Sequence, residues 1–285
     1  MRPSFRVGLV LSLALSAPLG QANEAGEAPI GWREPKETGI SWRGMLPAES
    51  GVVAGAPMLY PGVPGAGLGG LLAAILTHGA IVSSAQAAQR KAEQESADKV
   101  LDPYRPALDV WTAQGLWERA AADDSVQPRL KLMPEGAAWD GPVVETLPVF
   151  SLAPDERSLV LDVAVRLAGA AANSATDIAV RVVSSPVEGD ARAFWSADES
   201  ARLKAHAAGM LAHAVRIARH HARAAQDDPP ARTYRYTFGS VDRSERGQLV
   251  EGNCERTVLR TLRGGLISVP AKAVLGADCQ RRMAF

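Results

Sequence analysis

The sequence has no excess of charge of either sign. Its 285 residues include 31 basic and 31 acidic side chains, which cancel. A protein that binds nucleic acid through phosphate groups needs a net basic surface, so no nucleic-acid partner is expected. The G-x-S-x-G, H-E-x-x-H, P-loop and C-x-x-C motifs are all missing. The sequence therefore predicts no catalytic residue, no cofactor site and no metal site from a recognisable motif.

Long hydrophobic runs are also scarce, and the first of them is typical of a cleavable secretory signal. Arg2 and Arg6 precede an apolar stretch, Val7–Ser16, and small residues follow up to Ala22. The apolar stretch is too short to span a bilayer comfortably, which argues against an uncleaved membrane anchor. We therefore expect residues 1–22 to be a signal peptide, and the mature chain to lie in the periplasm or cell envelope.

Cysteine is nearly absent, because the chain contains only Cys254 and Cys279. An even number of cysteines in an exported chain favours a disulfide, since oxidising compartments form and preserve such bonds. We therefore predict a disulfide bond between Cys254 and Cys279, which would tie the C-terminal tail to the sheet. Two buried free thiols are the alternative.

The second hydrophobic run, residues 62–85, is almost free of charge. In it Gly65, Gly69 and Ala73 recur every four residues, a glycine-zipper spacing that lets two helices approach closely. The run is long enough to cross a bilayer, but its large aliphatic side chains contribute only about −2.4 to −4.8 kcal/mol to insertion. The segment is therefore predicted to be a helix that contacts a membrane surface or a partner helix. Burial in the chain's own fold and a transmembrane span are the alternatives.

The same run contains a G-x-G-x-x-G pattern at residues 65–70, which in dinucleotide-binding proteins places pyrophosphate at a helix N-terminus. Pro57, Pro61 and Pro64 interrupt the strand that such a site needs before its glycines. A polar helix is predicted after the glycines, where the dinucleotide fold needs a second strand. Dinucleotide binding is therefore not expected.

The remainder of the chain divides by its hydrophobic periodicity. Residues 23–64 are rich in Gly and Pro and predict an extended arm with one short strand near residues 39–43. Residues 65–123 predict a helical region, in which a first helix runs on from the glycine zipper and a second covers residues 106–122. Residues 125–285 predict a separate α+β domain, because strands, one long helix and further strands follow one another there.

Within that domain, apolar residues recur every two residues in several stretches, as in strands, and every 3.6 residues in one stretch, as in a helix. Alternating apolar residues over 157–167 and 176–184 predict an antiparallel hairpin. A capping box at Ser196–Glu199 predicts the start of a long helix that ends near Ala225. The remaining predicted strands are 233–241, 248–252, 256–263 and 266–269. The predicted fold class is thus α+β, an antiparallel sheet of about five to six strands backed by one long helix and preceded by the glycine-zipper helix.

Histidines recur every seven residues along the long predicted helix. His206, His213 and His220 therefore share one face, and Arg216 and Arg223 lie on or beside it. Residues seven apart on a helix are about 10.5 Å apart, which is too far for two imidazoles to share a zinc ion. The pattern favours a plain solvated face of the helix, and a strip that binds an anion such as a phosphate or a lipid headgroup is the alternative.

These patterns favour a non-enzymatic, exported protein of the bacterial cell envelope, which is membrane-associated or part of an assembly through residues 62–85. A homo-oligomer held together by the glycine zipper is one form of such an assembly. Two other classes stay open: an exported enzyme or small-ligand-binding protein whose site is assembled from scattered residues, and a secreted structural or adhesive module.

Overall fold

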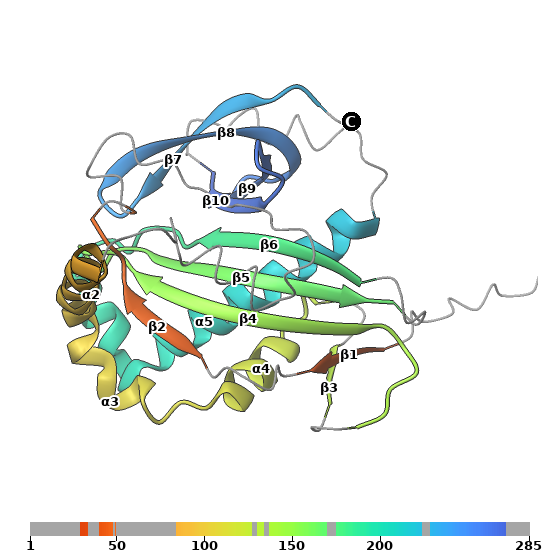
Figure 1. Ribbon diagram of the computed structural model, residues 1–285, viewed down its shortest axis with the longest axis horizontal. Helices are drawn as coiled ribbons and strands as arrows, with labels where there is room; N and C mark the ends of the chain where they lie inside the picture. The colour runs from red at the N-terminus through yellow and green to blue at the C-terminus, as the bar shows by residue number, and fades with distance from the viewer. Residues whose placement is uncertain are drawn as a thin grey trace, which may run out of the picture.

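The structure, a computed structural model, describes residues 29–33, 40–47, 49, 84–126, 130–133, 137–169, 175–223 and 229–271. These residues form one mixed sheet of ten strands with a long helix, α5, on one face (Figure 1). The helices are α2 (Ser84–Asp98), the 3-10 helix η1 (Lys99–Tyr104), α3 (Arg105–Leu108), α4 (Ala113–Ala121) and α5 (Ala191–Arg223). The strands are β1 (Ile30–Arg33), β2 (Ser41–Gly44), β3 (Leu130–Leu132), β4 (Val143–Leu152), β5 (Leu159–Ala168), β6 (Ala175–Val183), β7 (Arg232–Phe238), β8 (Val241–Gly252), β9 (Arg256–Thr261) and β10 (Leu266–Pro270).

The strands are ordered β3-β1-β4-β5-β6-β10-β9-β8-β7, and β2 also pairs with β4. Two antiparallel groups, β4 to β6 and β7 to β10, are joined where β10 runs parallel to β6. β1 and β2 run parallel to β4. The α+β class is confirmed, but the predicted antiparallel sheet of five to six strands is wrong, because the sheet is mixed and larger.

The additional strands come partly from the predicted arm. β1 and β2 lie one after the other along the same edge of β4, opposite Val143–Glu145 and Val149–Leu152 respectively. Pro148 lies opposite the gap between them, so the missing N–H of its backbone removes no hydrogen bond to β1 or β2. The short strand expected near residues 39–43 is confirmed as β2.

The hairpin predicted from alternating apolar residues is confirmed by β5 and β6, which pair antiparallel over their whole length. The odd-numbered residues of β5, such as Leu161 and Val163, pack toward α5, together with Val180 and Val182 of β6. The even-numbered residues of β5 lie on the opposite face of the sheet. We call that opposite face of β4, β5 and β6 the open face.

Helix α5 buries the predicted apolar stripe, which consists of Leu203, Met210, Leu211, Ala214, Ile217 and Ala218. α5 begins at Ala191, where the Asp190 carboxylate accepts a hydrogen bond from the Ala193 N–H at 3.0 Å and supplies the cap. The sequence pattern does not predict this first helical stretch. The predicted capping box lies at a kink of non-helical residues, where Asp198, Glu199 and Ser200 have positive φ angles of 52°, 54° and 61°, and the long helical part of α5 follows it directly.

The region between β2 and β3 is helical, as expected, but its helices are shorter and more numerous than predicted. α2 ends at Asp98 and continues as η1, which contains Pro103. The single helix predicted over residues 106–122 is wrong, because α3 and α4 are separated by residues 109–112. The Thr112 hydroxyl accepts a hydrogen bond from the Gly115 N–H at 3.1 Å, which caps a new helix and explains the break.

One buried threonine connects the N-terminal strand, α4 and the sheet. The Thr146 hydroxyl on β4 accepts hydrogen bonds from the indole N–H groups of Trp32 on β1 and Trp117 on α4, at 3.0 and 2.8 Å. All three side chains are at most 2 % exposed. Residues from β1, α4 and β4 therefore belong to one hydrophobic core with α5.

Residues Gly65, Gly69 and Ala73 lie outside the described residues, so the glycine-zipper helix stays a prediction. Among the helices that the structure describes, none combines the length and the apolar composition needed to cross a bilayer. Cys254 lies in the turn between β8 and β9 and is exposed, and the described residues contain no free cysteine. Cys279 lies outside the described residues, so the bridge between the two cysteines also stays a prediction.

Candidate functional site

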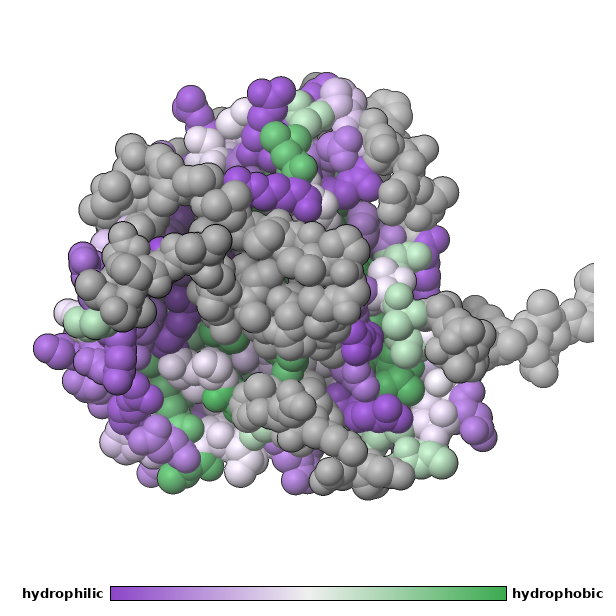
Figure 2. Space-filling model, viewed as in Figure 1, coloured by the Kyte–Doolittle hydropathy of each residue, from purple (hydrophilic) through white to green (hydrophobic). Residues whose placement is uncertain are grey.

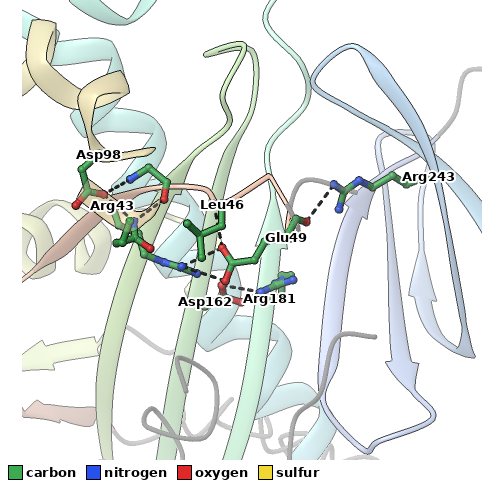
Figure 3. Close-up of polar contacts among 9 residues, drawn as sticks. Arg43, Leu46, Glu49, Asp98, Asp162, Arg181 and Arg243 are labelled. Carbon is green, nitrogen blue, oxygen red and sulfur yellow. Dashed lines mark hydrogen bonds and ion pairs between the residues drawn. The ribbon is translucent and has the colours of Figure 1, made fainter. Parts of the chain in front are cut away.

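A charged network lies where β2 meets the open face of the sheet (Figure 3). The Glu49 carboxylate accepts hydrogen bonds from Arg43 Nη1 at 2.9 and 3.0 Å and from the backbone N–H of Leu46 at 3.3 Å. The Glu49 carbonyl accepts a further bond from Arg243 of β8 at 3.1 Å. The network therefore ties the N-terminal part of the chain to the C-terminal group of strands.

A buried ion pair on the open face lies next to this network. The guanidinium of Arg181 on β6 donates to both carboxylate oxygens of Asp162 on β5, at 2.6 and 2.8 Å (Figure 3). The two residues face each other in the strand register. Only 1 % of the Asp162 side chain and 12 % of the Arg181 side chain are exposed. Removing one partner of a bidentate pair with so little solvent costs much more than breaking an exposed pair, because the remaining charge is left buried.

A second cluster surrounds Glu156 in the turn between β4 and β5. Glu156 has a positive φ of 57°, a conformation that is strained for any residue other than glycine. Its carboxylate accepts hydrogen bonds from the Tyr104 hydroxyl and from Arg192 at 2.5 Å, and its carbonyl accepts one from the Trp195 indole at 2.6 Å. Burial and the hydrogen bond to Glu156 raise the pKa of Tyr104 well above its usual value. Tyr104 is fully buried, so this cluster fixes η1 and α5 to the turn.

The third cluster contains part of the candidate anion-binding strip. His213 Nε2 lies 2.8 Å from the Ser268 hydroxyl of β10, and Arg256 Nε of β9 donates to the same hydroxyl at 2.9 Å. Arg256 also donates to the Val183 carbonyl at 2.7 Å. A serine beside a histidine is the arrangement of an activated nucleophile, but Ser268 is fully buried and its oxygen already accepts a bond from arginine. The contact is therefore a structural link between α5 and the β9–β10 hairpin.

The anionic group that lies against this strip is a carboxylate of the protein itself, that of Glu251. Arg216 binds both carboxylate oxygens of Glu251 on β8, and His220 Nδ1 lies 3.7 Å from the same carboxylate. Burial opposes ionisation of Glu251, but the Arg216 guanidinium outweighs it and lowers the pKa of the carboxyl. His206 lies apart and packs edge-on against the rings of Phe194 and Trp195. Arg223 is exposed at the C-terminal end of α5.

Acidification is expected to destabilise the protein through His213. Burial, together with the positive charges of Arg256 and Arg216, lowers the pKa of His213 to about 4 from an ordinary 6.5. Between these two values the unfolded chain binds the proton and the folded chain does not, so the free energy of unfolding falls as the pH falls. The loss should reach about 3 kcal/mol by pH 4. Urea unfolding at pH 7.5 and 4.0 measures it.

His213→Gln should remove most of this pH dependence, because glutamine can still bond to Ser268 but does not titrate. The matched control is His220→Gln, on the same helix but with 57 % of the histidine side chain exposed. The assignment is wrong if His213→Gln and the parent lose equal stability between the two pH values.

Sequence reasoning identified three members of this cluster, His213, Arg216 and His220, but missed their partners on β8, β9 and β10. Among the described residues, no group of three or more His, Cys, Asp or Glu side chains lies close enough together to hold a metal ion.

The chain was compared with protein-family models, with curated proteins and with solved structures. No match was found in any of the three.

Proposed function

We propose that the chain is a non-enzymatic, exported protein of the bacterial cell envelope that works through noncovalent contacts. This proposal rests on the partners that its buried and half-buried carboxylates bind. Four of them each bind an arginine of the same chain, in the pairs Glu49–Arg43, Asp162–Arg181, Glu156–Arg192 and Glu251–Arg216. Carboxylate oxygens that already accept such bonds are committed to holding strands and helices together, not to proton transfer with a substrate.

The sequence supports the export part of the proposal, through the signal pattern of residues 1–22. We propose the apolar segment 62–85 as the contact element, and its proposed partner is a membrane surface or a helix of another chain. Burial in the fold of the chain itself is the alternative.

Fractionation of the expressed protein tests export and membrane contact together. We expect the mature chain in the periplasmic or envelope fractions, with Asn23 as its first residue by N-terminal sequencing, because small residues precede Ala22. Membrane contact predicts sedimentation with membranes and release by detergent, whereas contact with another chain or burial in the fold predicts a periplasmic protein. A chain that still begins at Met1 and stays in the cytoplasm would overturn the proposal.

A further inference from the structure

The open face carries an apolar patch at its centre. Leu147 and Val149 of β4 and Ala164 of β5 are 5 %, 2 % and 0 % exposed, and they form a hydrophobic cluster of their own. Helix α5 packs on the other face of the sheet, so it does not cover them. Among the described residues, no further hydrophobic side chain packs against this cluster.

The strand register shows how the face is organised. Leu147, Ala164 and Ala179 lie side by side across β4, β5 and β6, and Val149 lies beside the ion pair of Asp162 and Arg181 in the next row. The two alanine side chains are small, so they leave a shallow depression, which we call the floor, beside the leucine on the surface of the sheet. The side chains of this floor are close-packed only if another element lies close against the sheet.

The β7–β10 strands curl around one side of the open face without reaching this patch. Their apolar side chains, among them Tyr236, Phe238 and Ile267, pack together with Val160 and Val183 in a separate cluster. In the view of Figure 2, which is that of Figure 1, hydrophobic residues are visible between hydrophilic ones over the strands below β7–β10. Strands β7–β10 therefore do not bury the patch, so the element that buries it lies outside the described residues.

We propose that the open face is the docking surface for the apolar segment 62–83 of the same chain. This inference rests on the proposed function for export alone, because it places the contact of the segment within the chain and not with a membrane or another chain. The segment contains no Asp, Glu, Lys or Arg, and its Gly65, Gly69 and Ala73 offer a flat backbone surface to the small residues of the floor.

The two ends of the undescribed stretch support this assignment. The chain leaves the described structure at Glu49, which Arg43 and Arg243 hold at the edge of the open face (Figure 3). It returns at Ser84, in helix α2, which is attached to β2 by a 2.8 Å bond from the Gly44 N–H to the Asp98 carboxylate. Residues 50–83 thus start beside β2 and end at the first residue of a helix that is attached to β2 at its other end, so an apolar segment between these ends can reach the patch.

The buried ion pair is a second, independent indication of a cover. Asp162 lies on the open face and is only 1 % exposed, although charged side chains on an uncovered sheet face are solvated. A covering apolar segment excludes water from Asp162 and Arg181 and from the neighbouring apolar patch at the same time.

Photo-cross-linking of the purified full-length mature protein tests the inference. A p-benzoylphenylalanine in place of Leu147 should form a cross-link within one chain, and mass spectrometry should locate it in residues 62–83. The control probe replaces Leu262, which is 68 % exposed in the β9–β10 turn, and should give no such product. A probe in place of Arg166, whose side chain is 28 % exposed at the rim of the patch, serves if the Leu147 variant does not fold.

Three results would overturn the inference: a product of twice the chain mass, which would make a second copy the occupant; a cross-link to another peptide; or no product above the Leu262 control. None of these results bears on export, because fractionation of the unmodified protein decides that separately.

Discussion

Replacing Arg181 with methionine is expected to lower the free energy of unfolding by about 3–5 kcal/mol. Methionine keeps most of the packing volume of arginine but leaves the Asp162 carboxylate, 1 % exposed, without the guanidinium that binds both of its oxygens. Denaturant unfolding of the variant and the parent at pH 7 measures the difference. The matched control is Arg166→Met, which breaks the pair with Asp177 on the same two strands. That pair is about one-third exposed, so its loss should cost about 1 kcal/mol or less.

The double variant Asp162→Val, Arg181→Met should recover most of the lost stability, because a buried ion pair replaced by well-packed apolar residues is often neutral. Valine also suits a strand position. Two outcomes would contradict the burial argument. One is an equal loss in the Arg181 and Arg166 variants, and the other is a double variant that is no more stable than Arg181→Met.

The second large effect is expected at Thr146. Thr146→Val keeps the shape of the side chain but removes the hydroxyl that accepts both indole N–H groups of Trp32 and Trp117. Each buried donor left without an acceptor costs about 1–3 kcal/mol, so the free energy of unfolding should fall by about 4 kcal/mol. Unfolding followed by tryptophan fluorescence measures this loss.

Thr146→Ser is the control for this prediction, because it keeps the hydroxyl and loses only a methyl group. It should cost about 1 kcal/mol. If the valine variant is as stable as the serine variant, the indole bonds contribute little and the three elements are held together by packing alone.

The parts of the fold that were predicted correctly are those in which one face is buried and neighbours in sequence decide the structure. Leu161 and Val163 alternate with residues of the other face, so β5 was visible as a strand. The stripe from Leu203 to Ala218 identified α5 for the same reason. The bounds of β4 could not be predicted from the sequence, because the strand is buried on both faces and its apolar residues do not alternate with polar ones.

The remaining errors come from contacts between distant residues. β1 and β2 are four-residue strands in a stretch rich in Gly and Pro, and they exist because β4 offers them an edge. The spacing of His213 and Arg216 could be read from the helix period, whereas Glu251 and Ser268 reach them only because β8 and β10 fold back onto α5. The helical stretch that precedes the capping box at Ser196–Glu199, and that Asp190 caps, was not predicted.

The position of β10 in the sheet has a consequence for how the chain folds. β10, the last strand in sequence that the structure describes, lies in the interior of the sheet, where it pairs with β6 on one side and β9 on the other. The two strand groups are therefore not joined in one sheet until residues 266–270 are available. Such pairing across a long stretch of chain raises the contact order and slows folding. If the chain is exported N-terminus first, its sheet closes only after almost all of it has crossed.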